Sequence, residues 1–261
     1  MSRPLVGLAE LAHHTDSFLR TAEIADYPQA LNGVQVRNRQ PLSRVAVAVD
    51  CSVRTIRAAI AAEAQLLLVH HGLFWGGLQR ITGPFYDRLQ LLLSHDIALY
   101  SSHLPLDGHA ELGNGVQLAQ ALGLAVSGGF AEYKGFACGV QGSADLPTNE
   151  LHERAVAFSA PWGHRTISSP IPDGHRTRRW AICTGSGAQV ETLAQARALG
   201  IDTLIVGEGP HWSAVDADEH GFVIIYAGHY ATETLGVRAL AGHWETRFGL
   251  PWQFIDAPTG L

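Results

Sequence analysis

The sequence has few cysteines and no long apolar segment. Its three cysteines, Cys51, Cys138 and Cys183, are far apart and form no CxxC pair. This spacing argues against both a disulfide framework and a thiolate zinc site. No apolar run reaches the roughly 18 residues that a membrane helix needs, and the N-terminal residues form no apolar stretch of the signal-peptide kind. We therefore expect a cytoplasmic protein without a membrane partner.

Charge is also sparse. Only 16% of the 261 residues are charged, and the net charge of −6 comes with no basic block. This composition argues against disorder, a coiled coil and an extended nucleic-acid surface. Hydrophobic residues make up 46% of the chain, enough for the core of one large domain or of two lobes. Fourteen histidines stand against a single methionine, and histidine is the commonest metal ligand.

Apolar segments typical of strands alternate with amphipathic segments typical of helices. This alternation predicts an α/β layer fold with at least part of the sheet parallel. Because the theme occurs before and after the middle of the chain, it favours two similar lobes. The middle, 128–147, indicates strands and turns, and 164–180 indicates an exposed connection rich in Pro, Gly and Arg. The predicted strands are 45–50, 66–71, 97–103, 179–185, 202–208, 222–229 and 252–256, and the predicted helices 53–64, 84–96, 115–124, 149–159, 188–200 and 232–248.

Three clusters of potential metal ligands follow predicted strands. His70-His71 ends one strand, His103 and Asp107 follow the next, and His229 follows a third, with Glu233 four residues later. Ligands of parallel sheets gather beyond the carboxyl ends of the strands. We therefore expect the three clusters to lie at the same end of one sheet.

The spacing within two clusters predicts geometry. Successive side chains of a strand point to opposite faces, so His70 and His71 should diverge and serve two ions. His229 and Glu233 should share one helix face, where the carboxylate can bridge two ions. Each cluster alone is also compatible with ordinary polar residues at a strand end, an Asp-Gly turn or a helix start. Their conjunction, three nitrogens and two carboxylates, favours two divalent ions with positions open to water.

Other polar features are weaker. His13-His14 lies in a predicted N-terminal helix and is interpreted as solvated surface. The TGSG sequence at 184–187 fits either a phosphate-binding turn or a plain turn. Glu208 and His211 follow a strand. They fit three interpretations: binding of substrate, hydrogen bonding to the metal ligands, or an ordinary polar loop. We name His103 and His211 as candidates for moving protons or binding substrate.

Together these motifs resemble the Nif-three-like dinuclear metal-centre family, whose members are often called GTP cyclohydrolase I type 2 homologues. The resemblance runs almost end to end, and the His-His, HxxxD and GHYATE motifs make it specific. It implies that the metal ligands are His70, His71, Asp107, His229 and Glu233. It rests on LNGVQV (31–36), VAVAVD (45–50), LLLVHHGLFW (66–75), YSSHLPLDGH (100–109), GNGVQLAQALGL (113–124), CTGSG (183–187), VGEGPHW (206–212), AGHYATETLGV (227–237) and DAPTGL (256–261).

The resemblance also implies an architecture. We expect two α/β lobes with mixed sheets, a dinuclear metal site in the cleft between them, and a ring-shaped homohexamer. Residues 1–126 with 222–261 would build the metal-binding lobe, and 127–221 the second lobe. Two positions depart from the family pattern: Gly72 replaces the usual proline and should loosen the metal loop, and Val206 replaces the usual threonine.

The function implied is that of a metal-dependent hydrolase with two divalent ions per chain. Mixed nitrogen and oxygen ligands admit Zn, Fe, Mn, Ni or Co. The substrate would be a small molecule, either GTP, as in a cyclohydrolase, or another nucleotide-like or phosphoester compound. The alternative is a non-enzymatic metal protein that regulates a partner or delivers metal.

Overall fold

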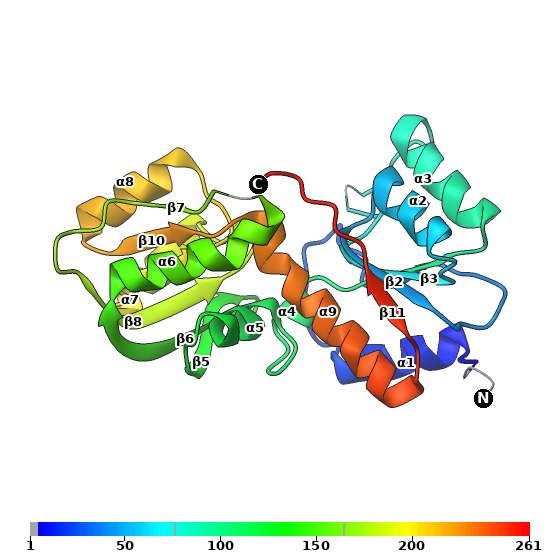
Figure 1. The fold of residues 1–261 in the computed structure, drawn as a ribbon, viewed down its shortest axis with the longest axis horizontal. Coiled ribbons are helices and arrows are strands. Elements are labelled where there is room, and N and C mark those ends of the chain that lie inside the picture. Colours follow the sequence, from blue (N-terminus) through cyan, green and yellow to red (C-terminus); the bar gives the residue numbers. More distant parts are fainter. Residues whose placement is uncertain (1–4, 76, 164) are drawn as a thin grey trace. The chain divides into compact units, whose positions relative to one another are not determined.

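The computed structural model describes residues 5–75, 77–163 and 165–261. The chain divides into two compact units. The first unit comprises Met1–His109 and Gly236–Ala257, and the second comprises Ala110–Leu235 and Pro258–Leu261. Both units combine helices with a mixed sheet, so the predicted two-lobed α/β fold is confirmed (Figure 1).

The first unit is built on a five-stranded sheet in the order β1-β4-β3-β2-β11. Strand β1 is antiparallel to β4, and the other neighbours are parallel. The carboxyl ends of β3 and β4 therefore lie at the same edge. The elements of this unit are α1 (Leu8–Phe18), β1 (Gly33–Val36), β2 (Val45–Asp50), α2 (Val53–Ala61), β3 (Leu66–His71), α3 (Gly83–Ser94), β4 (Ala98–Ser101), α4 (Leu104–Asp107), β11 (Trp252–Phe254) and most of α9 (His229–Phe248).

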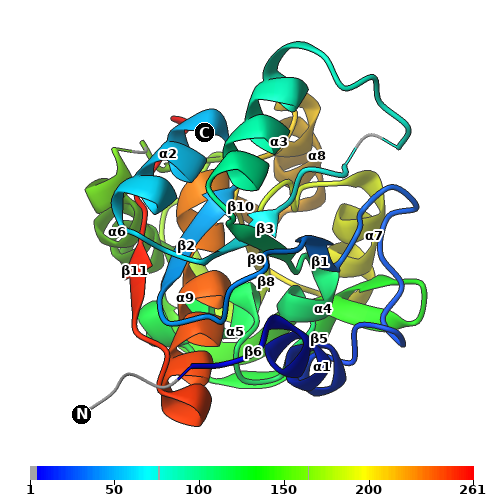
Figure 2. The ribbon, with the colours of Figure 1, turned by 90° about the vertical axis from the view of Figure 1, so that its right-hand side faces the viewer.

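Helices α2 and α3 pack against one face of this sheet (Figures 1 and 2). Alternate residues of β2 and β3 point to that face, such as Ala46, Ala48, Leu67 and Val69. Because β2 and β3 are covered on both faces, they are almost continuously apolar. A capping box starts α2, in which the Ser52 and Thr55 hydroxyls each accept the other residue's backbone N–H.

The second unit is built on a six-stranded sheet in the order β5-β6-β8-β9-β10-β7. Strands β8, β9 and β10 are parallel to one another, and the outer pairings are antiparallel. The elements are α5 (Asn114–Ala121), β5 (Val126–Tyr133), β6 (Phe136–Pro147), α6 (Thr148–Ser159), the 3-10 helix η1 (Ala160–Trp162), β7 (Ile167–Ser168), β8 (Arg176–Cys183), α7 (Val190–Leu199), β9 (Thr203–Val206), α8 (His211–His220), β10 (Val223–Tyr226) and the start of α9.

Alternating side chains divide the core of the second unit into two layers. Trp180, Ile182 and Ile205 face α5 and α6, whereas Ala181 and Leu204 face α7 and α8. The sheet is thus the middle of a three-layer α/β/α arrangement. Its central strands end in loops that lead to 184–187, 207–210 and the start of α9.

The elements differ from the predictions in identifiable places. Strands 45–50 and 66–71 have the predicted bounds. The stretch 164–180 was wrongly expected to be only an exposed connection; His164 itself lies outside the described residues. It contains β7, which pairs with β10, and the start of β8, and it buries Thr166, Ser169 and Thr177. Helix α8 and strand β1 were not predicted. No helix in the described part of the chain is long and apolar enough to cross a membrane.

Candidate metal centre

His70 and His71 end the central strand β3 of the first unit. His70 is fully buried, and its Nδ1 donates to the Ser102 carbonyl oxygen at 2.9 Å. His71 is half-buried, and its Nδ1 donates to Asp50 Oδ1 at 2.8 Å. The two ring centroids are only 4.9 Å apart. The expected divergence is therefore wrong, because the bond to Asp50, the partner of His71 across β2 and β3, fixes the last ring of the strand.

His103 directly precedes the short helix α4, just beyond the adjacent strand β4, and Asp107 is the last residue of that helix. Asp107 Oδ2 lies 3.4 Å from His70 Nε2. His103 Nδ1 donates to Asp26 Oδ1 at 2.9 Å, and the Asp26 side chain is only 5% exposed. Burial tends to raise the pKa of Asp26, but the hydrogen bond and charge of His103, together with hydrogen bonds from Asn32 and Tyr27, outweigh it and hold that pKa below its usual value. Sequence reasoning missed Asp26, because no local motif links it to a histidine 77 positions away.

These histidines share one arrangement. In each of His70, His71 and His103, Nδ1 donates to an oxygen, so the lone pair resides on Nε2. The three residues offer ligand nitrogens that lie within 4.8 Å of one another. A carbonyl or carboxylate behind the ring is the usual way in which proteins orient metal-binding imidazoles. The donor set thus fits a borderline divalent ion.

The second unit contains a histidine, His229, that is oriented by the same kind of hydrogen bond from Nδ1. His229 begins helix α9, and its Nε2 lies 3.1 Å from Glu233 Oε2. The i, i+4 spacing therefore places both side chains on one helix face, as predicted. His229 Nδ1 donates to Glu208 Oε1 at 2.7 Å, and the Ser186 hydroxyl donates to the same oxygen at 3.1 Å. Glu208 thus stands behind the imidazole rather than in a plain polar loop.

Charge around His229 controls its protonation. Burial tends to lower the pKa of His229, but the hydrogen bonds and negative charges of Glu233 and Glu208 outweigh it and raise the pKa to about 9. The same two carboxylates would stabilise a cation bound at Nε2. The electrostatics therefore suit a positive charge at this point.

The TGSG turn is shaped by contact with this histidine and carboxylate. Gly185 has φ +59, and a Cβ there would overlap Glu233 Oε1. Gly185 N–H donates to the Thr232 hydroxyl at 3.1 Å, and its carbonyl accepts Glu208 N–H at 2.8 Å. The glycine therefore allows the turn to approach α9 closely, which favours the interpretation as a packing turn.

The predicted clusters do not all lie on one sheet. His70-His71, His103 and Asp107 follow β3 and β4 of the first unit, whereas His229 follows β10, which pairs with β9 and β7 in the second unit. The expectation of one sheet was therefore wrong, since strand pairing joins segments distant in sequence. His211 is exposed at the first residue of α8.

The interpretation of His13-His14 as solvated surface holds for only one of the two residues. His13 is exposed, but His14 is half-buried, and its Nε2 lies 2.9 Å from His243 Nε2. Phe18 stacks on His243 with ring centroids 4.2 Å apart. The pair therefore does not form a solvated surface, because α1 packs against α9 there.

Gly72 does not loosen the loop after His71. The Gln35 carboxamide occupies the space that a side chain at residue 72 would need. It accepts Leu73 N–H at 2.7 Å and donates to the Leu31 carbonyl at 2.6 Å. Gln35 therefore braces this loop. Val206 is fully buried in β9, where it packs in the core of the second unit.

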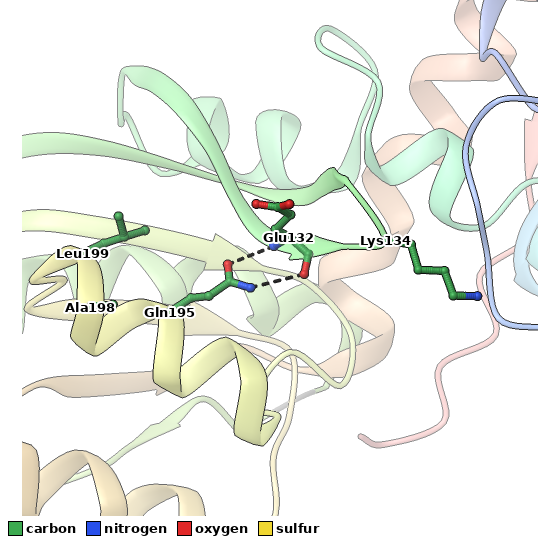
Figure 3. Close-up of a pocket in the computed structure, with 5 residues that line it drawn as sticks. All are labelled: Glu132, Lys134, Gln195, Ala198 and Leu199. Atoms are coloured by element: carbon green, nitrogen blue, oxygen red, sulfur yellow. Dashed lines mark hydrogen bonds between the residues drawn. The ribbon is translucent and has the colours of Figure 1, made fainter.

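A shallow pocket elsewhere in the second unit contains none of the predicted site residues. Glu132, Lys134, Gln195, Ala198 and Leu199 line it. Figure 3 shows the Gln195 carboxamide pairing with both backbone groups of Glu132, at 2.9 and 3.2 Å. Gln195 thus acts as a substitute strand partner for the sheet edge at β5.

Fold and sites together define a class: a two-sheet α/β protein whose strand ends carry oriented histidines and carboxylates. The family model for Duf34/NIF3 (NGG1p interacting factor 3) matches residues 6–259. The chain belongs to this family, and the resemblance drawn from its motifs is confirmed.

Individual proteins are similar over nearly the whole chain. The GTP cyclohydrolase 1 type 2 homolog of Deinococcus radiodurans is 41% identical over 260 residues, covering 98% of this chain and 95% of that protein. The structure of TTHA1606 from Thermus thermophilus is 34% identical with a TM-score of 0.82, covering 97% of this chain and 99% of that one. Protein ybgI, of unknown function, is 33% identical with a TM-score of 0.87, at the same coverage.

Proposed function

We propose that this protein is a metal-dependent hydrolase that binds two divalent ions through His70, His71, Asp107, His229 and Glu233. The observation that carries the proposal is the shared arrangement of the histidines. Each of His70, His71 and His229 donates from Nδ1 to an oxygen and directs Nε2 to its cluster. Histidines that bind metal almost always donate their other ring N–H to an oxygen in this way.

The bound ions would lower the pKa of water and stabilise negative charge that develops on the substrate. The chain's own residues would supply orientation and proton transfer. His103, held by Asp26, would accept or deliver a proton at Nε2. His211, exposed at the start of α8, would bind the substrate or move a proton.

Relatives carry the name GTP cyclohydrolase 1 type 2 homolog, so a nucleotide or another phosphoester is the first choice. The alternative is a non-enzymatic role in regulation or metal delivery. We further propose a homohexamer, for which the mass of the native assembly, measured by native mass spectrometry, is the direct test.

The deciding experiment combines metal content with turnover. The protein is loaded separately with Zn, Fe, Mn, Ni or Co and incubated with GTP, other nucleotides and simple phosphoesters. We expect two ions per chain and turnover that His70→Ala abolishes, whereas His13→Ala, at an exposed position, leaves both unchanged. Metal binding without turnover of any substrate would favour the non-enzymatic alternative. A protein that binds no metal would contradict both.

A further inference from the structure

Two large aromatic side chains stand exposed beside the histidine cluster of the first unit. Trp75 is 39% exposed and Tyr27 is 48% exposed, although rings of this size usually bury most of their area. The Trp75 ring centroid lies 4.6 Å from that of His103 and 5.4 Å from that of His71. The exposed rings therefore adjoin the imidazoles whose Nε2 atoms are oriented for metal.

The same hydrogen bonds that orient His103 also hold this aromatic pair. Tyr27 N–H donates to Asp26 Oδ1 at 2.7 Å, the oxygen that accepts from His103. Leu31 N–H donates to the Phe74 carbonyl at 3.3 Å, which ties the Tyr27 segment to the Trp75 segment. The pair is thus fixed to the cluster by backbone bonds on both segments.

The packing angles show that Trp75 is not stacked flat against the rings beside it. Trp75 meets His103 at 88°, Tyr27 at 79° and His71 at 66°. Rings that meet at steep angles place the edge of one ring against the face of the other, whereas parallel rings cover each other's faces. Among the ring contacts described for this part of the chain, none is parallel to Trp75. Because 39% of Trp75 is exposed, a flat ring can stack on it, as bases do on aromatic side chains.

We propose that Tyr27 and Trp75 form a binding platform for a planar heterocycle, such as a purine base, whose anionic remainder reaches the histidine cluster. This inference rests on the proposed function for the role of that remainder. An organic cation would also suit aromatic rings, but the two proposed divalent ions would repel it. A heterocycle that carries a phosphate can stack on the aromatic rings and place its negative charge near the proposed ions.

The test compares binding of GMP and AMP with that of ribose 5-phosphate, which keeps the sugar and phosphate but lacks the base. Dissociation constants are measured by calorimetry on metal-loaded wild type, Trp75→Ala, Trp75→Phe and Trp212→Ala. Trp212 is a matched control, because it is 43% exposed but lies on α8 in the second unit. Metal content is measured on all four proteins.

We expect the wild type to bind a nucleotide at least about tenfold more tightly than ribose 5-phosphate, as a gain of about 1.4 kcal/mol gives. Trp75→Ala should abolish this preference, Trp75→Phe should keep most of it, and Trp212→Ala should leave it intact, all at unchanged metal content. Equal binding of nucleotides and ribose 5-phosphate by the wild type would overturn the platform. A preference for nucleotides that survives in Trp75→Ala would also overturn the platform. If that variant also changed the mass of the assembly, the two rings would be assigned to a contact between protein chains.

The platform and the hydrolase can fail separately. A preference for the base that depends on Trp75 in protein without turnover would leave the platform standing and contradict the hydrolase. Hydrolysis of base-free phosphoesters without any preference for nucleotides would support the hydrolase and contradict the platform.

Discussion

Asp26 and His103 form a buried pair across 77 positions of the chain, with Oδ1 and Nδ1 2.9 Å apart. The same carboxylate accepts from Asn32 Nδ2 at 2.8 Å and from Leu104 N–H at 3.2 Å. Asp26, in the segment between α1 and β1, thus holds both His103, the candidate for proton transfer, and the first residue of α4. Its removal would leave four donors without this acceptor, since Tyr27 N–H also donates to it.

Asp26→Ala should therefore lower the free energy of unfolding by about 2–4 kcal/mol, since buried donors lose a charged acceptor. Urea denaturation measures this cost. Asp145→Ala serves as the control, because Asp145 pairs with Arg176 on the surface, where an ion pair contributes little to stability. Equal costs for the two variants would contradict the role of Asp26.

The cost of Asp26→Ala should depend on pH. The folded pKa of Asp26 lies below its usual value because the hydrogen bond and charge of His103, with the hydrogen bonds of Asn32 and Tyr27, outweigh burial. A depressed pKa contributes stability above the unfolded value of about 3.9 and loses it as pH falls toward the folded pKa. The difference in unfolding free energy between wild type and variant should therefore shrink below about pH 4. A constant difference from neutral to acid pH would show that the charge is not responsible.

Glu208→Ala should weaken metal binding without abolishing it. Glu208 contacts His229 Nδ1 rather than the proposed ligand atom Nε2, and loss of such a supporting group typically costs about 10–100-fold in metal affinity. Occupancy measured by mass spectrometry should fall at limiting metal and recover in excess metal. Glu132→Ala, at an exposed position of the same unit, should change nothing. Loss that no metal concentration restores would make Glu208 a ligand itself.

Glu233→Gln should lower the occupancy of both proposed ions. Two divalent ions in proximity repel each other, neutral histidines cannot offset that repulsion, and only Asp107 and Glu233 bring negative charge to the ligand set. His70→Ala or His71→Ala removes a neutral ligand and no negative charge, so each should lower the total metal content less than Glu233→Gln does. Metal content at matched metal activity separates these outcomes, and retention of both ions by Glu233→Gln would rule out a bridging role.

Strands and side-chain faces that depend on residues close together in the sequence could be predicted. The runs 45–50 and 66–71 are strands because continuous apolar segments bounded by turns bury on both faces. The spacing of His229 and Glu233 predicted their shared helix face. The order of strands and polar residues predicted that the clusters after β3 and β4 would lie at the same end of a sheet, where His70 and Asp107 do lie close together.

Long-range pairing explains what could not be predicted. Asp26, Asp50 and Glu208 each reach a histidine through tertiary contacts that leave no periodic signal. Strand β7 has only two residues and exists because β10 offers it an edge. Likewise, the assignment of β10 to a second sheet depends on its partners rather than on its own residues.

Gly72 and Gln35 should behave as one unit when mutated, since the Gln35 carboxamide fills the space of a Cβ at residue 72. Gly72→Ala should push the carboxamide away from Leu73 N–H and the Leu31 carbonyl, at a cost of about 1–3 kcal/mol for the two bonds. Gln35→Ala should cost a similar amount by removing the same bonds. On the Gln35→Ala background, Gly72→Ala should cost almost nothing or gain a few tenths of a kcal/mol, because alanine restricts the unfolded chain more than glycine does.

A double-mutant cycle in guanidinium chloride measures this coupling between residues 35 and 72. The double variant should be about as stable as Gln35→Ala alone, because the overlap disappears together with the carboxamide. Gly163→Ala is not a suitable control, since φ +70 there would add backbone strain, whereas Gly242→Ala is suitable because a Cβ at that helical position meets no other atom. Gly242→Ala should give the same small change with or without Gln35. If the costs of Gly72→Ala and Gln35→Ala were simply additive, Gln35 would not be the group that requires glycine at residue 72.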